Sequence, residues 1–243
     1  MAEVHRIQEL DLFTRKPDCI LRVLSLNGPA SAPLLQRLRL KSLVSPNATS
    51  IPPDILRREK PSLRRLELED FYFSPGLPPL PHLTYLKISL SLSTMTPSSL
   101  LISLRYATSL KEIDIAGMAK DDPSDLTMTR VQLPNLVRIS ITSNHIESAT
   151  IFANLEYPPS TTVAFTSRRV ATTNPDLSSL SNICGRFHEI DAPAIHKIDL
   201  NSRYPAPFRL DVWGPGPQSS ASPWRWDSRP YCGLRDAVLG LTA

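Results

Sequence analysis

Aliphatic residues recur along the chain in a motif of three, in which two residues separate the first from the second and one separates the second from the third. The motif, L-x-x-L-x-L with Ile allowed, occurs six times between residues 7 and 141. Alternation of apolar with other residues at its end is typical of a strand with one buried face. The copies are Ile7/Leu10/Leu12, Leu35/Leu38/Leu40, Leu63/Leu66/Leu68, Leu83/Leu86/Ile88, Leu110/Ile113/Ile115 and Leu136/Ile139/Ile141.

The copies follow one another at a nearly constant distance. They begin at residues 7, 35, 63, 83, 110 and 136, so the steps are 28, 28, 20, 27 and 26 residues. A period of about 20–29 residues with this motif is typical of leucine-rich repeats. A conventional α/β fold with Leu-rich strands is the alternative, but it does not explain the spacing. We therefore predict an α/β leucine-rich-repeat solenoid, or horseshoe, with a parallel sheet on its concave side, helices and loops on its convex side and an irregular C-terminal cap.

The intervals between the copies contain signals for helix starts. Thr96-Pro97 combines an N-cap residue with a proline at the first helical position. Further starts are predicted at Pro17-Asp18, at Glu147 and at Asn174-Pro175. The interval after the third copy is the shortest, so we expect only a loop or a short 3₁₀ turn there.

The motif degrades toward the C-terminus, where strands are still expected at Val163/Phe165, at Ile195/Ile198/Leu200 and at Leu210/Val212. Units at the end of a repeat array are often atypical because they cap the core. We expect the solenoid to span residues 1–204, with clear repeats over 5–166 and degenerate ones after them. Residues 205–243, rich in Pro and Trp, are expected to form an irregular cap or tail.

Residues between the buried positions should lie side by side on the concave face, in columns that run across the strands. One column alternates in charge, so it is interpreted either as a self-neutralising ladder or as a charged docking strip. Exposed pairs of this kind contribute about 0–1 kcal/mol each. This column comprises Asp11, Arg39, Glu67, Lys87, Asp114 and Ser140.

The adjoining column places Arg37 beside Arg65 and then Tyr85, and arginine and tyrosine are favoured at the centres of protein interfaces. A third column begins with Phe13, which we expect to be an exposed aromatic residue. The second column comprises Glu9, Arg37, Arg65, Tyr85, Glu112 and Arg138. The residues predicted to bind a partner on the concave face are Arg37, Arg39, Arg65, Tyr85, Lys87, Glu112 and Arg138.

Charge and composition narrow the class of partner. The net charge is +4, and residues 1–65 carry 12 basic and 6 acidic side chains. A nucleic-acid binder usually concentrates more charge on one face, so no nucleic-acid partner is expected. The chain starts without an apolar signal-peptide core and has no apolar run of about 18 residues, which predicts a cytoplasmic or nuclear protein without a membrane partner. Three widely spaced cysteines, Cys19, Cys184 and Cys232, are interpreted as reduced thiols.

Motifs for catalysis are missing from the sequence. No phosphate-binding loop, no nucleophile elbow and no pair of histidines at the helical spacing of a zinc site occurs. We therefore predict no catalytic, cofactor-binding or metal-binding residues and no cofactor, and we interpret the chain as a non-catalytic protein-binding module. An enzyme of unrecognised type is the remaining alternative.

Several segments resemble the leucine-rich-repeat part of the large fungal, mushroom-type F-box proteins. The resemblance covers about residues 5–166 and is moderately specific. The segments that carry it are APLLQRLRLKS at 32–42, PSLRRLELEDFYF at 61–73, LPHLTYLKIS at 80–89 and LPNLVRISI at 133–141.

The resemblance implies a role as the substrate-recognition part of a ubiquitin-ligase adaptor, in which the repeats bind a protein substrate. In that family an F-box before the repeats docks onto a cullin–RING ligase, whereas here the first repeat begins at Ile7. A cullin–RING ligase adaptor is therefore expected as a partner only if the full-length product contains an F-box. The alternative is a free-standing repeat scaffold without a ligase role.

Overall fold

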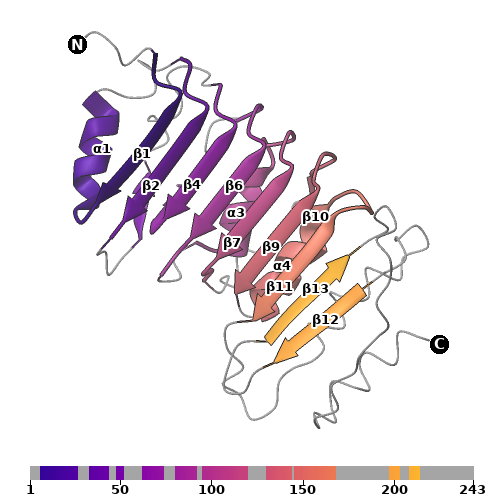
Figure 1. The fold of residues 1–243 in the computed structure, drawn as a ribbon. Coiled ribbons are helices and arrows are strands. Elements are labelled where there is room, and N and C mark those ends of the chain that lie inside the picture. Colours follow the sequence, from indigo (N-terminus) through magenta and orange to yellow (C-terminus); the bar gives the residue numbers. More distant parts are fainter. Residues whose placement is uncertain are drawn as a thin grey trace, which may run out of the picture.

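A computed structural model of the 243-residue chain describes residues 6–26, 33–43, 48–51, 62–73, 80–91, 95–119, 130–143, 145–167, 197–202 and 208–213. Within these ranges the main feature is a nine-stranded sheet (Figure 1). In spatial order its strands are β1 (Glu9–Thr14), β2 (Arg37–Ser42), β4 (Arg65–Glu69), β6 (Tyr85–Ser89), β7 (Glu112–Ala116), β9 (Arg138–Ser143), β11 (Thr162–Ser167), β13 (Phe208–Trp213) and β12 (Lys197–Ser202).

The strands from β1 to β11 run parallel to their neighbours, which confirms the predicted α/β class with a mostly parallel sheet. The aliphatic motif determines the register, because corresponding positions of successive copies pair directly and are buried. Leu10 and Leu12 are only partly buried because β1 has a neighbour on one side. The two buried columns are Leu38, Leu66, Leu86, Ile113, Ile139 and Val163, and Leu40, Leu68, Ile88, Ile115, Ile141 and Phe165.

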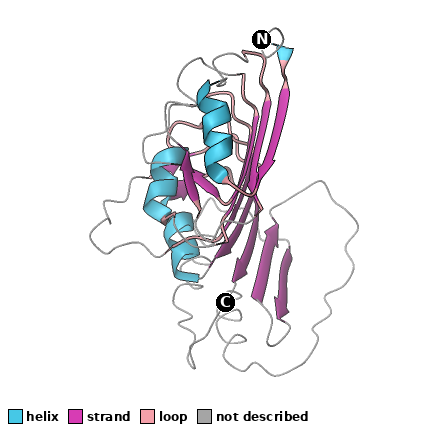
Figure 2. Cartoon of the chain, turned by 90° about the vertical axis from the view of Figure 1, so that its left-hand side faces the viewer, coloured by secondary structure: helices cyan, strands magenta, loops and turns pink. Residues whose placement is uncertain are grey.

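Helices cover the buried face of this sheet. They are α1 (Pro17–Leu26), α3 (Pro97–Leu104) and α4 (His145–Asn154), and all lie on one side of it (Figure 2). The predicted cap of α3 is confirmed, because the Thr96 hydroxyl accepts from the Ser99 amide and the Ser99 hydroxyl accepts from the Thr96 amide. Helix α4 begins two residues before the predicted start at Glu147, which is itself buried. Among the described residues, no helix has both the length and the apolar composition needed to cross a lipid bilayer.

Two short parallel pairs accompany the helices: β3 (Thr49–Ile51) with β5 (Phe71–Phe73), and β8 (Val131–Gln132) with β10 (Leu155–Glu156). Strand β5 corrects the prediction for the shortest interval, where a loop or a 3₁₀ turn was expected. Phe71 and Tyr72 belong to the aromatic residues that favour strands, and Phe71 is completely buried. This interval therefore contributes to the core despite its length.

The C-terminal end of the sheet changes direction. Strand β13 is antiparallel to β11, and β12 is antiparallel to β13. Both segments were predicted as strands, but β12 comes first in sequence and lies at the edge, while β13 lies between it and β11. The sheet thus extends across the expected boundary between residues 204 and 205. The helix predicted from Asn174 and residues 214–243 lie outside the described ranges.

A repeated backbone arrangement docks each unit onto the next. The Arg64 carbonyl accepts hydrogen bonds from the amides of Thr84 and Tyr85, over 2.8 and 3.0 Å. The Thr84 carbonyl does the same for Lys111 and Glu112, over 2.8 and 3.0 Å. We call these residues the double-acceptor positions; they are Gln8, Gln36, Arg64, Thr84 and Lys111.

Tight turns precede several strands. The Leu83 amide donates to the Leu80 carbonyl, and the Leu136 amide donates to the Leu133 carbonyl, both over 3.1 Å. Pro81 and Pro134 occupy the second position of these turns, where their fixed φ angle is favourable. Prolines before motif copies thus help to set where the strands begin.

Candidate functional site

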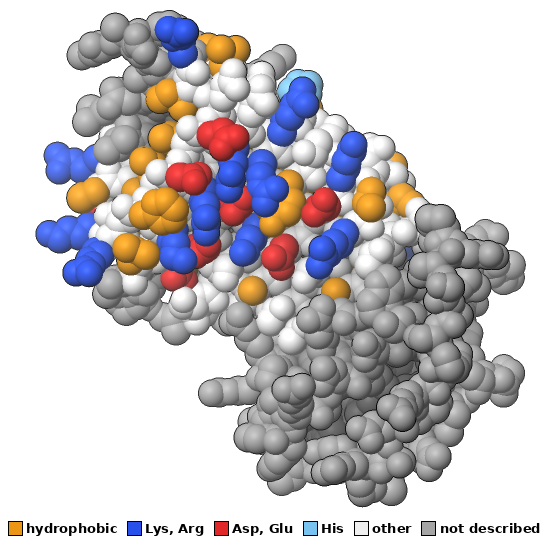
Figure 3. All heavy atoms as spheres, viewed as in Figure 1, with side chains coloured by type: hydrophobic (Ala, Val, Ile, Leu, Met, Phe, Trp, Pro, Cys, Tyr) orange, Lys and Arg blue, Asp and Glu red, His pale blue; other side chains and the backbone are white. Residues whose placement is uncertain are grey.

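The sheet face opposite the helices carries the residues predicted to bind a partner. The register pairs Arg37 with Arg65, Arg65 with Tyr85, and Tyr85 with Glu112. Arg138 continues this column, while Arg39 and Lys87 flank Glu67 in the next one. All seven predicted residues therefore belong to one face. Figure 3 shows basic and acidic side chains interleaved across it.

Glu67 is at the centre of this face, yet only 6% of its side-chain surface is exposed. Three arginines surround its carboxylate. Arg65 Nε donates to Glu67 Oε1 over 2.6 Å, Arg37 Nη2 donates to the same oxygen over 3.3 Å, and Arg39 Nε lies 3.6 Å from Glu67 Oε2. The carboxylate is thus covered by the guanidinium groups that neutralise it.

Glu69 extends the network along the same strand. Its carboxylate accepts a 2.8 Å hydrogen bond from Arg39 Nη2 and forms an ion pair with Lys41. Arg37 additionally pairs with Glu9 over 3.5 Å. We call this network the Glu67 cluster; it comprises Arg37, Arg39, Lys41, Arg65, Glu67 and Glu69.

Two of the ion pairs, Arg37 with Glu67 and Arg39 with Glu69, run diagonally between columns. Arg39 Nη2 reaches Glu69, two residues beyond its direct neighbour Glu67, because a long side chain spans the diagonal distance between adjacent strands. The expected facing pairs of Asp11 with Arg39, Glu67 with Lys87 and Lys87 with Asp114 form no ion pair in the described part of the chain. The predicted ladder is therefore correct in strand register but wrong for these three pairs.

Charge and burial act in opposite directions on the two carboxylates. Burial raises the pKa of Glu67, but the hydrogen bond from Arg65 and the positive charges of Arg65, Arg37 and Arg39 outweigh this effect, so its pKa lies below the ordinary value of 4.5. The pKa of Glu69 is lowered in the same way, since the hydrogen bonds from Lys41 and Arg39 outweigh the effect of burial. Both carboxylates are therefore ionised at neutral pH.

Aromatic rings border the Glu67 cluster on two sides. The Arg65 guanidinium carbon lies 3.8 Å from the centroid of the Tyr85 ring, and that of Arg39 lies 5.5 Å from the centroid of the Phe13 ring. Both distances are in the range of a cation–π interaction. Phe13 is 51% exposed, in agreement with the prediction of an exposed aromatic residue.

Beyond Tyr85 the face carries charged side chains that form no ion pair within the described ranges. Lys87 and Arg138 form no side-chain hydrogen bond or ion pair within the described ranges, and Glu112 is exposed without a salt-bridge partner there. Burial raises the pKa of Tyr85, so its hydroxyl stays protonated at neutral pH and can donate a hydrogen bond. The predicted residues thus divide into two groups. Arg37, Arg39 and Arg65 form ion pairs within the protein, whereas the available group comprises Tyr85, Lys87, Glu112 and Arg138.

Sequence reasoning placed Glu67 in its column but did not include Glu67, Glu69 or Lys41 among the site residues. A signal for them was present, because the segment RLRLK at 37–41 is followed one unit later by RLELE at 65–69. Stacking these two segments in register brings three basic residues next to two acidic ones.

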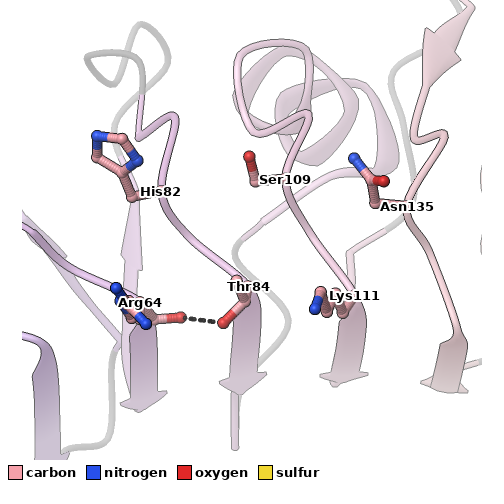
Figure 4. A pocket seen from close by; sticks show the side chains of 6 residues that line it. All are labelled: Arg64, His82, Thr84, Ser109, Lys111 and Asn135. Carbon is pink, nitrogen blue, oxygen red and sulfur yellow. Dashed lines mark hydrogen bonds between the residues drawn. The ribbon is translucent and has the colours of Figure 1, made fainter.

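Three further features of the described residues concern metal binding, cysteine thiols and a surface groove. Within the described ranges, no three His, Cys, Asp or Glu side chains come together so that they could hold a metal ion. Cys19 is an exposed free thiol, and Cys184 and Cys232 lie outside those ranges. A shallow groove lies at the sheet edge where the strands begin, and polar side chains line it (Figure 4).

No protein-family model, curated protein or solved structure matches the chain.

Proposed function

We propose that the chain is a leucine-rich-repeat solenoid that acts as a non-catalytic binding module for another protein. Three repeated features support the solenoid: the aliphatic motif in strict register, the double-acceptor carbonyls and the helices or short strands on the opposite side of the sheet. Each strand with its returning segment corresponds to one unit, and stacked units share one core.

The observation that carries the functional proposal is the available group of side chains beside the Glu67 cluster. Tyr85, Lys87, Glu112 and Arg138 lie on a continuous sheet face, where a partner meets an aromatic ring and both signs of charge. Docking onto them breaks no ion pair among the described residues. Rigid placement also lowers the entropy cost of binding, because the strands are already fixed.

The arginines of the Glu67 cluster have a different role in this proposal. Arg37, Arg39 and Arg65 neutralise the buried carboxylate and hold Tyr85 and Phe13 in place, so they shape the surface rather than provide its main contacts. A partner that engaged them directly would have to compete with short hydrogen bonds inside the protein.

Charge reversal on the available group tests this surface. We expect the double variant Lys87→Glu with Arg138→Glu to lose the proteins that the wild-type chain captures from a lysate of its source cells. The matched control is Arg105→Glu, because Arg105 is exposed at the end of α3 on the opposite side of the sheet. Chemical cross-linking through the Lys87 amine should connect this residue to the captured protein. Unchanged capture by the double variant would refute the surface assignment.

The biological role that we propose is substrate recognition for a ubiquitin ligase, in the cytoplasm or the nucleus. The support is the resemblance of residues 5–166 to the repeats of fungal F-box proteins, and a cullin–RING adaptor enters only through an F-box in the full-length product. Co-purification of cullin and its adaptor with the full-length product supports this role. Capture of a partner without them favours the free-standing scaffold, and turnover of a substrate by the purified chain would favour an enzyme.

A further inference from the structure

The groove at the N-terminal ends of the central strands is lined by basic and neutral polar side chains, whereas the exposed sheet face carries charges of both signs. It crosses the starts of β4, β6 and β7 and is lined by two rows of side chains (Figure 4). One row is Arg64, Thr84 and Lys111, and the other is His82, Ser109 and Asn135.

The backbone fixes both rows. Arg64, Thr84 and Lys111 are three successive double-acceptor positions, each directly before its strand. His82 and Ser109 precede Thr84 and Lys111 by two residues each, so the second row repeats with the same period as the first. Adjacent strands lie about 4.8 Å apart, so Arg64 and Lys111 flank Thr84 at a backbone separation of roughly 10 Å. Their long side chains can both reach a small group held between them.

The charged side chains that line the groove are all basic. Arginine, lysine and histidine line it together with two hydroxyls and an amide, and no carboxylate is among the lining residues. Arg64 and Lys111 form no ion pair in the part of the chain that the structure describes, in contrast to the arginines of the Glu67 cluster. Two uncompensated cations in one groove favour an anion.

The uncommitted donors fit a tetrahedral anion. The Thr84 hydroxyl donates to the Arg64 carbonyl over 3.0 Å, and the Asn135 amide donates to the Thr108 carbonyl over 3.1 Å, so these two groups hold the walls together. The Arg64 guanidinium, the Lys111 ammonium and the Ser109 hydroxyl remain as donors. A phosphate group has three strongly accepting oxygens and nearly two negative charges, which these donors can match.

We propose that this groove binds a phosphate group carried on a side chain of the partner protein. The identity of the carrier rests on the proposed function, whereas phosphate binding itself does not. A nucleic acid fits less well, because the groove is lined by only two permanent cations, Arg64 and Lys111, and the cations of the adjoining Glu67 cluster are already paired with Glu67 and Glu69, whereas a long polyanion is bound through many phosphate contacts. The groove thus receives one phosphate at the rim of the protein-binding surface.

The test is a titration of the full chain with N-acetyl-phosphoserine amide, followed through the backbone amide signals of Thr84, Ser109 and Lys111 by NMR. We expect saturable shifts at these signals and an affinity about tenfold lower in Arg64→Ala and in Lys111→Ala, because each variant loses one charge-assisted contact. Arg105→Ala is the matched control and should bind like the wild type. Both groove residues dock their neighbours through carbonyls, so the substitutions should leave the fold intact.

The comparison ligands make the proposal refutable. N-acetyl-aspartate amide tests for simple attraction of a carboxylate, and an oligothymidylate tests for a nucleic acid. Binding of the aspartate derivative as tightly as the phosphoserine derivative, tighter binding of the oligothymidylate, or an equal loss in Arg105→Ala would each overturn the proposal.

Failure of this site and failure of the binding surface are distinguishable. The Lys87→Glu/Arg138→Glu variant should retain phosphoserine binding whether or not it captures a protein partner. If dephosphorylation of the lysate and the Arg64→Ala substitution both leave capture of the partner unchanged, the proposal of a phosphorylated partner is refuted. The assignment of the sheet face as the binding surface would still stand.

Discussion

Arg65 and Glu67 lie two residues apart on β4, and the guanidinium Nε of the first donates to the carboxylate of the second over 2.6 Å. The same guanidinium stacks on the ring of Tyr85 in the next strand. One arginine thus connects the buried acid of the Glu67 cluster to the aromatic residue that begins the available group. Because of this connection, we expect a change at the buried Glu67 to alter the position of the partly exposed Tyr85 ring.

Glu67→Gln is expected to lower the free energy of unfolding by about 1–3 kcal/mol, because the amide keeps the shape but removes the charge that pairs with Arg65 and helps to neutralise Arg37 and Arg39. Urea denaturation followed by circular dichroism measures the change. Glu9→Gln is the matched control, since the Glu9 side chain is 68% exposed and its pair with Arg37 should contribute less than about 0.5 kcal/mol. Equal effects of the two variants would show that the Glu67 cluster does not stabilise the sheet.

The stability of the wild type should fall in acid because of the same carboxylates. Their pKa values are lower in the folded chain than the ordinary 4.5, so their contribution is present above about pH 4.5 and is lost as the pH falls through the folded-state values. Urea midpoints between pH 3 and 7 test this, and the gap between wild type and Glu67→Gln should narrow toward the acidic end. A gap that stays constant over this range would contradict the assignment.

Gly117→Ala should destabilise the chain by about 2 kcal/mol or more. Gly117 follows β7 with φ at +79°, and a Cβ atom there would lie 2.0 Å from the Leu90 carbonyl oxygen of the neighbouring unit. A backbone atom cannot move aside as the end of a side chain can. Thermal unfolding measures the effect, and Ser89→Ala, at the end of β6, is a control that requires no positive φ. A wild-type melting temperature in Gly117→Ala would refute this close packing.

Asp70 allows the backbone and side-chain contributions at a strand end to be separated. Its φ is +59°, and its carboxylate accepts hydrogen bonds from the Ser91 amide over 2.6 Å and the Ser91 hydroxyl over 3.0 Å. Asp70→Ala should cost about 1–2 kcal/mol, since it loses both contacts and tolerates this conformation less well. Asp70→Gly removes the contacts without the conformational penalty, so denaturation should place it between Ala and wild type. The reverse order would show that the side-chain contacts are unimportant.

The strand register and the helix cap could be predicted from the sequence because each follows from a short sequence motif. Alternation in the aliphatic motif decides which face of a strand is buried, and Thr96-Pro97 contains its own start signal. Stacking identical motifs then determines which residues lie in a column, and all the predicted columns are present.

Other features depend on contacts that the motif does not encode. The burial of Glu67 results from arginines reaching across strands, which the register alone does not show. The inserted position of β13 depends on pairing in the antiparallel direction, for which the motif gives no rule. The groove was missed because its residues lie before the strands, at positions that the periodic pattern leaves unconstrained.

The main-chain hydrogen bonds of the double-acceptor positions are the same whether glutamine, arginine, threonine or lysine occupies them, and the Thr84 hydroxyl adds one further bond to the Arg64 carbonyl. The main-chain bonds themselves do not depend on what the side chain is. The rim of the sheet can therefore exchange one ligand preference for another by substitution, without any adjustment of the scaffold underneath. A designer could rewrite the chemistry of that rim residue by residue while the stacking of the units stays the same.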